Sequence, residues 1–229
     1  MKLSEAIAER NSCRAFSTCE VSREDITELI EAGIRAPSKG NSQIWEFVAV
    51  MGEKKRAMDE MLFNLLKTDF IPSMTLGDAA TPAESEAMRK AGARSSRNRE
   101  EIVKILAPYG QTFEAFMLEG TFTFFKAPVA ILVFVDEVFS KDLPHILSVG
   151  AAVQNVLLAA TEKKFGTCWI GGVWRYTKEI RDLLGIPGNK KLLSSIALGY
   201  VDPYNPMSRY KSSRDDIGEF VRWIGFDKG

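Results

Sequence analysis

The chain has 229 residues, 45% of them hydrophobic and 26% charged, which suits one globular domain or at most two small ones. Its 30 basic and 30 acidic residues give a formal net charge of zero, which argues against general attraction to nucleic acid or to an anionic membrane. With a single histidine, His145, and three scattered cysteines, a Cys/His zinc site and a histidine-dependent hydrolase are both disfavoured.

The N-terminus carries charges throughout and has no apolar core, so it does not predict a signal peptide. We find no run of about 18 apolar residues and expect no transmembrane helix. Cys13, Cys19 and Cys168 form no CxxC pair, and such sparse cysteines are typical of a reducing compartment. The sequence therefore predicts a cytoplasmic protein with no nucleic-acid partner and no membrane partner.

The first elements in chain order are two helices, a polar loop and a strand. Residues 3–10 predict a short helix. Ser22 can cap a second helix, whose apolar residues recur at helical spacing. This helix must end near residue 36, because Pro37 disfavours helix at the residue before it. A polar loop over 37–43 and a strand over 45–51 follow.

The middle of the chain predicts further helices and a loop. Residues 54–70 have the pattern of an amphipathic helix, and 71–83 that of a loop. Residues 83–106 predict an exposed helix with a thin apolar face, which we interpret as a mobile or lid-forming segment. Residues 111–126 are dense in phenylalanine. These side chains could serve core packing, a dimer contact or a substrate wall, and we favour the first two.

The last part of the chain alternates apolar strands with helices. Continuous apolar runs predict buried strands over 128–136 and 192–200. Residues 148–165 predict a central helix that ends at Gly166, followed by a short strand over 167–170. A further amphipathic helix covers 176–184. The tail from residue 201 is too polar to fold alone, and we expect it to wrap over something, with a partner subunit as one candidate.

This order of elements predicts a single α/β or α+β domain over 1–229, with a small sheet between helices. Residues 68–114 would form a helical lid or excursion from it. The chain has neither a GxGxxG turn after a strand nor a GxxxxGK[ST] loop, so no Rossmann or P-loop nucleotide site is predicted.

Four local clusters carry chemistry. Around Arg10, Ser12 and Arg14, two guanidinium groups and a hydroxyl can close round one phosphate. The amide-rich loop 37–43 suits the edge of a heteroaromatic ring. Gly171 and Gly172, after a strand, let a flat ligand approach bare backbone. Residues 211–214 form a second basic cluster. Read alone, each cluster also fits an ordinary turn or surface segment.

Taken in this order, the clusters resemble the nitroreductase family of flavoproteins over nearly the whole chain. The segments that carry the resemblance are RNSCRAF from residue 10, APSKGNSQIW from residue 36, and the helix and strand ending in GTCWIGG at residue 172. Asn11, Ile44 and the Ile-Gly-Gly ending at Gly172 depart from the family pattern. The resemblance implies an α+β fold with a small mixed central sheet flanked by helices.

The resemblance also implies a homodimer that holds one FMN at each subunit interface and exchanges its C-terminal arms. One subunit would hold the phosphate and ribityl chain and place Gly171 and Gly172 by the flavin N5. The loop 37–43 would come from the other subunit. The implied cofactor-binding residues are Arg10, Asn11, Ser12, Arg14, Pro37, Ser38, Lys39, Asn41, Gln43, Gly171, Gly172, Lys211 and Arg214.

The implied activity is that of an NAD(P)H-dependent flavin oxidoreductase. Hydride would pass from NADH or NADPH through flavin N5 to a nitroaromatic, a quinone or an activated alkene. The flavin carries this chemistry, so no catalytic side chain and no metal are implied. Two alternatives stay open: a different flavin reaction, such as dehalogenation or desaturation, and a flavin-binding dimer without catalysis.

Overall fold

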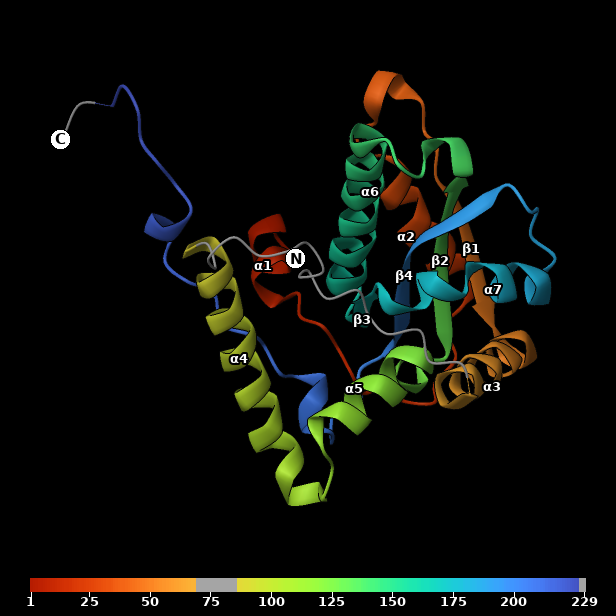
Figure 1. The fold of residues 1–229 in the computed structure, drawn as a ribbon, viewed down its shortest axis with the longest axis horizontal. Coiled ribbons are helices and arrows are strands. Elements are labelled where there is room, and N and C mark those ends of the chain that lie inside the picture. Colours follow the sequence, from red (N-terminus) through yellow and green to blue (C-terminus); the bar gives the residue numbers. More distant parts are fainter. Residues whose placement is uncertain (69–85, 227–229) are drawn as a thin grey trace.

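The computed structural model describes residues 1–68 and 86–226, which form a small sheet with helices on both faces (Figure 1). The strands are β1 (Glu46–Met51), β2 (Val129–Asp136), β3 (Phe165–Ile170) and β4 (Lys190–Tyr200). The helices are α1 (Leu3–Glu9), α2 (Arg23–Ile34), α3 (Gly52–Thr68), α4 (Glu86–Leu106), α5 (Phe113–Phe122), α6 (Leu143–Glu162) and α7 (Thr177–Leu184).

The four strands lie in the order β1-β2-β4-β3, and each neighbouring pair is antiparallel. The predicted α+β class with a small central sheet between helices is thereby confirmed, but the four strands pair only in antiparallel fashion, where a mixed sheet was predicted. Parallel pairing enters at the edge of β3, where Ser12 forms a single parallel bridge with Thr167. This bridge attaches the segment after α1 to the sheet.

Strand β2 contributes side chains to the hydrophobic cores on both faces of the sheet. It is buried along nearly its whole length, as its continuous apolar run predicts. Ile131 and Val133 pack with α2 and α6 on one face, whereas Leu132 and Phe134 pack with α3, α5 and α7 on the other. The second of these helical layers forms one wall of the pocket described below.

Local sequence signals place α2 correctly. The Ser22 hydroxyl accepts a hydrogen bond from the Asp25 N–H at 3.0 Å, as its predicted capping role requires. Gly33 lies against α6, where a Cβ would stand 2.7 Å from Val156 Cγ2. The two helices therefore pack closely through a residue without a side chain.

The end of the central helix differs from its prediction. α6 spans Leu143–Glu162, and the turn after it is made by Lys164 with a φ of 67°. Gly166 is already the second residue of β3, so the prediction that it stops the helix is wrong. A Cβ at Gly166 would lie 2.7 Å from Cys13 Sγ, so this glycine allows the N-terminal segment to approach the strand.

Within the described residues, α6 is the one helix long and apolar enough to cross a membrane by length and composition. It packs against α2 and β3, as a core helix does, so this signal is weak.

Helix α4 covers the described part of the predicted exposed helix, and the chain after β4 runs beside it (Figure 1). Ile102 and Leu106 of α4 are buried with Met207 of that tail. The predicted loop 71–83 lies outside the described residues. The assignment of 68–114 as a lid stays a prediction.

Candidate functional site

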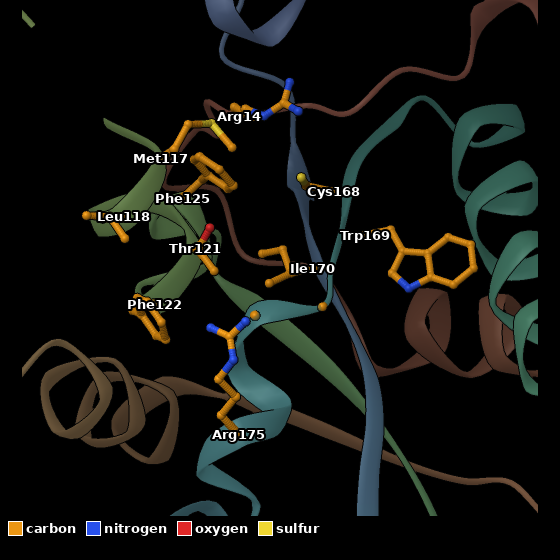
Figure 2. Close-up of a pocket in the computed structure, with 12 residues that line it drawn as sticks. Arg14, Met117, Leu118, Thr121, Phe122, Phe125, Cys168, Trp169, Ile170 and Arg175 are labelled. Carbon is orange, nitrogen blue, oxygen red and sulfur yellow. The ribbon is translucent and has the colours of Figure 1, made fainter. Parts of the chain in front are cut away.

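A cavity of about 360 Å³ lies between α5, the end of β3 and the segment after α1. Figure 2 shows its lining, with Arg14 at one end and Arg175 at the other. Met117, Thr121 and Phe122 of α5 form an apolar wall between these two cations. The cavity is therefore long, apolar in its middle and basic at both ends.

Backbone pairing with β3 brings Arg14 to the cavity. The Cys13 N–H donates to the Thr167 carbonyl at 2.8 Å, next to the bridge between Ser12 and Thr167. One terminal N–H of Arg14 donates to the Ser12 carbonyl at 3.3 Å. Its Nε is buried and has no hydrogen-bond partner among the described residues. A buried donor of this kind is costly unless something accepts its hydrogen bond.

The guanidinium groups of Arg10 and Arg214 carry like charges that interact with each other. Burial, and then the charge of Arg214, lowers the pKa of Arg10, so the tail brings a second guanidinium close to the first. Within the described part of the chain, no carboxylate forms an ion pair with Arg10, Arg14 or Arg214. Forked guanidinium donors without a carboxylate suit a phosphate group.

The other predicted residues at this end hold the tail in place. The Asn11 side-chain amide donates to the Ser208 and Tyr210 carbonyls at 3.0 and 3.1 Å. Lys211 Nζ donates to the Ala8 carbonyl at 3.4 Å, in the last turn of α1. Both contacts join the tail to the N-terminal segment, and thereby bring Arg214 towards Arg10.

The end of β3 supplies a bare backbone edge. Gly171 and Gly172 both line the cavity. A Cβ on Gly171 would meet nothing within 4 Å, whereas one on Gly172 would lie 2.7 Å from Thr121 Cγ2. Gly171 thus faces open space, and Gly172 permits the close approach of α5.

Cys168 and Ile170 point to the cavity side of β3, while Trp169 points away towards α6 (Figure 2). The Trp169 indole N–H is hydrogen-bonded to the Ser194 hydroxyl. Burial raises the pKa of the Cys168 thiol, so the thiol is protonated at neutral pH. Because the thiolate is the reactive form, Cys168 is a poor nucleophile here.

The turn after α5 is strained at the cavity. Phe124, Phe125 and Lys126 have φ values of 52°, 52° and 59°, a left-handed conformation that costs roughly 1–2 kcal/mol per residue. The turn places the Phe125 ring in the cavity lining, where a Cβ on Gly120 would be 2.1 Å from it. Strain of this kind is concentrated at functional sites.

The predicted loop 37–43 lies elsewhere in the same chain, at the beginning of α6. The Lys39 N–H donates to the Ser148 hydroxyl at 3.2 Å, and Lys39 Nζ pairs with Asp142 at 3.0 Å. Asn41 and Gln43 take left-handed φ values of 55° and 45°. None of the residues 37–43 lines the cavity beside Arg14. The structure therefore separates the predicted residues into two groups within one chain.

Sequence reasoning missed part of the lining. Arg175 follows Gly172 by three residues, and this placement after a Gly-Gly turn was the available signal. Cys168 was identified only as part of a strand segment. Phe122 and Phe125 are both buried and line the cavity. Core packing of the phenylalanine-rich segment is thereby confirmed, and its roles as a dimer contact or substrate wall stay predictions.

The model of the nitroreductase family matches residues 7–200 of the chain. A 4-nitrobenzoate reductase from Nocardioides sp. (strain LMS-CY) is 25% identical over 227 residues, which cover 95% of this chain and 88% of that protein. A 4-nitrobenzoate reductase from Pseudomonas putida is 26% identical over 224 residues, covering 97% and 95%.

Comparison with solved structures also finds nitroreductases. A mutant of an FMN and NADPH-dependent nitroreductase from Sphigopyxis sp. strain HMH has a TM-score of 0.84 and 25% identity, covering 99% of this chain and all of that one. An FMN-dependent nitroreductase from Mycobacterium smegmatis in complex with NADPH has a TM-score of 0.80 and 21% identity, covering 97% and 100%. At the level of the family, the predicted enzyme class and cofactors are confirmed. The chain belongs to the nitroreductase family.

Proposed function

We propose that the protein is an FMN-dependent oxidoreductase that uses NADH or NADPH to reduce an oxidised aromatic acceptor. The observation that supports this most directly is the buried Nε of Arg14, which has no hydrogen-bond partner among the described residues, together with the interacting charges of Arg10 and Arg214. A phosphate group would accept a hydrogen bond from this Nε and would balance the guanidinium charges. When bound, FMN would supply hydride acceptance and donation at N5.

Within one subunit, Arg10, Ser12, Arg14 and Arg214 would hold the phosphate and ribityl chain. Lys211 and Asn11 would support them through the tail. The backbone N–H groups of Gly171 and Gly172 would lie along the ring edge, because this edge carries no side chain. The apolar wall of α5 would exclude water from the reacting face.

The loop 37–43 would complete the site from a second copy of the chain, through Pro37, Ser38, Lys39, Asn41 and Gln43. Its distance in sequence and space from the Arg14 cavity favours this arrangement over a site built from one subunit. We further propose that this homodimer works in the cytoplasm, since Cys13, Cys19 and Cys168 are all free thiols.

Among the acceptors, we favour nitroaromatics, with quinones and activated alkenes as further candidates. Arg175 lines the cavity at the end opposite Arg14 (Figure 2), where it suits a carboxylate on the acceptor ring. Two relatives are named for reduction of 4-nitrobenzoate. Arg175→Gln should therefore raise KM for 4-nitrobenzoate about tenfold, since a hydrogen bond to a charged group contributes about 1.5–3 kcal/mol. KM for nitrobenzene, which lacks the carboxylate, should stay unchanged.

The visible spectrum tests the proposal as a whole. The purified protein should be yellow or take up added FMN. NADH or NADPH should bleach it without oxygen, and 4-nitrobenzoate should restore the colour. A protein that binds no FMN would refute the proposal, and one that nicotinamide does not bleach would favour a different flavin reaction. Arg14→Ala should lower FMN occupancy, and unchanged occupancy would contradict the phosphate assignment.

A further inference from the structure

Helix α4 and the tail from Met207 to Phe220 are joined along their length, with the tail running beside the helix (Figure 1). Met207 is buried with Ile102 and Leu106 of α4. Further along, the Tyr210 hydroxyl lies 2.9 Å from Asn98 Oδ1 and 2.7 Å from Glu101 Oε2. The tail is thus fixed to α4 by apolar and polar contacts at its start.

Two acidic residues of the tail, Asp215 and Glu219, also turn towards α4, whereas Asp216 accepts a hydrogen bond from the Gly218 N–H at 2.9 Å within the tail. Asp215 is held by two arginines of the helix: Arg94 Nε lies 2.6 Å from Oδ2, and Arg97 Nη2 lies 2.5 Å from Oδ1. Glu219 pairs with Lys90 at 2.7 Å. These three cations on one helix keep the carboxylates of Asp215 and Glu219 on the same side of the tail.

The basic residues between these contacts turn the other way. Tyr210 and Asp215 enclose Lys211 and Arg214 in the sequence. Lys211 reaches the end of α1. Arg214 Nη1 donates to the Ser212 carbonyl and hydroxyl at 3.0 and 2.8 Å, and the charge of Arg214 lowers the pKa of Arg10. Lys211 and Arg214 therefore lie on the side of the candidate phosphate site, whereas Asp215 and Glu219 lie on α4.

This division matters because Asp215 directly follows Arg214. Opposite charges this close in the chain attract each other near a protein surface. A carboxylate that left α4 would therefore compete with phosphate for the Arg214 guanidinium. Arg94 and Arg97 remove that competitor by binding it themselves.

We propose that α4 is a brace that positions Arg214 for the cofactor phosphate, and that Asp215 is the positioning residue through which it acts. The proposal rests on the proposed function, since it assigns a role towards bound FMN. It also gives the cation-rich face of α4 a use that a solvent-exposed lid would not require. Because linkage is reciprocal, cofactor binding should in turn stabilise the docking of the tail on α4.

The test measures FMN affinity by fluorescence quenching in apoprotein. Asp215→Asn keeps the size of the side chain and removes its charge. It should weaken FMN binding about tenfold, within the range of about 5–150-fold typical of coupled sites. The matched control is Asp182→Asn, which removes the exposed ion pair of Asp182 with Lys178 on α7 and should leave FMN affinity unchanged.

Two further measurements separate positioning from general loss of structure. In an Arg214→Gln background, Asp215→Asn should cause no additional loss, because its effect passes through Arg214. Riboflavin lacks the phosphate, so Asp215→Asn should lower the ratio of FMN affinity to riboflavin affinity. Should Asp215→Asn fail to fold, Arg97→Gln removes one of the two ion pairs and takes its place.

The possible results are distinct. Equal losses for FMN and riboflavin, or full additivity with Arg214→Gln, would show a structural role and overturn the inference. Unchanged FMN affinity in Asp215→Asn would also overturn it, while leaving the proposed function intact. Failure of the wild-type protein to bind FMN would instead refute the proposed function itself.

Discussion

Gly166 decides how closely the cofactor-binding segment lies against the sheet. A Cβ at this position would stand 2.7 Å from Cys13 Sγ and 3.1 Å from Val201 Cγ2. Cys13 is fully buried, and its pKa is raised to about 11 by burial, so this thiol acts as a small apolar side chain. The contact between Gly166 and Cys13 therefore sets the position of Arg14 one residue later.

Replacing Gly166 by alanine should destabilise the protein and weaken FMN binding together. Overpacking of a tight core typically costs about 1–3 kcal/mol, and relief of the clash would push Arg14 away from the cavity. Urea unfolding and FMN titration measure the two effects. Gly188→Ala is the control, because a Cβ there meets nothing within 4 Å. Equal behaviour of the two variants would contradict this role of Gly166.

At the residue scale, the sequence predicts what depends on neighbours in the chain. The Ser22 cap is visible because its donor, Asp25, is three residues away. The proximity of Arg10 and Arg14 can be predicted for the same reason, because they are four residues apart in the chain. Arg214 was identified as part of a basic cluster in the tail, but its role beside Arg10 was implied only by resemblance, since no local pattern indicates that the two residues lie near each other.

Helix α3 carries a buried ion pair on the layer that supports α5. Lys55 is 3% exposed, and its Nζ lies 2.6 and 2.8 Å from the two carboxylate oxygens of Asp59. It also lies 4.9 Å from the centre of the Phe124 ring, in the strained turn beside the cavity. Burial lowers the pKa of Lys55 and raises that of Asp59 to about 6, so desolvation opposes both charges.

Removing one partner of this ion pair should lower the free energy of unfolding more than replacing both partners by apolar residues. Asp59→Asn leaves the Lys55 ammonium buried without its counter-ion and should cost about 3 kcal/mol of unfolding free energy. The double variant Lys55→Met with Asp59→Leu should recover most of that loss, because buried pairs are often replaceable by apolar residues. Chemical denaturation checks both values. A double variant less stable than Asp59→Asn would show that the charges themselves are needed.

At the element scale, periodicity predicts helices well and their ends less well. The apolar pattern located α6, but Lys164 rather than Gly166 makes the left-handed turn after it. Glycine is favoured in that conformation, but here the glycine is two residues later, as the second residue of β3, where it leaves room for Cys13. The contacts of α4 with Asp215 join residues more than 100 positions apart, and charge pairs at such distances leave no periodic signal.

Two exposed apolar residues of α6 lie beside the loop that we propose to complete the site of a second copy. Leu143 and Leu147, one turn apart on α6, are 63% and 64% exposed. They flank the beginning of α6, to which the loop 37–43 is attached through Lys39. The loop predicted to reach a partner's cofactor thus sits next to an uncovered apolar face.

A charge on this face should disrupt the dimer and the cofactor site together. Leu147→Glu would place a carboxylate in the proposed interface, where an unpaired buried charge is strongly unfavourable. Analytical ultracentrifugation should show a dimeric wild-type protein and a monomeric variant. FMN titration should show weaker binding, since loop 37–43 of the partner is lost. Tyr204→Glu, at a residue 93% exposed on the tail, should remain dimeric and bind FMN normally. A monomeric wild-type protein with full FMN affinity would refute the shared site, because all of its ligands would then have to come from the single chain in which Arg14 and Asn41 lie apart.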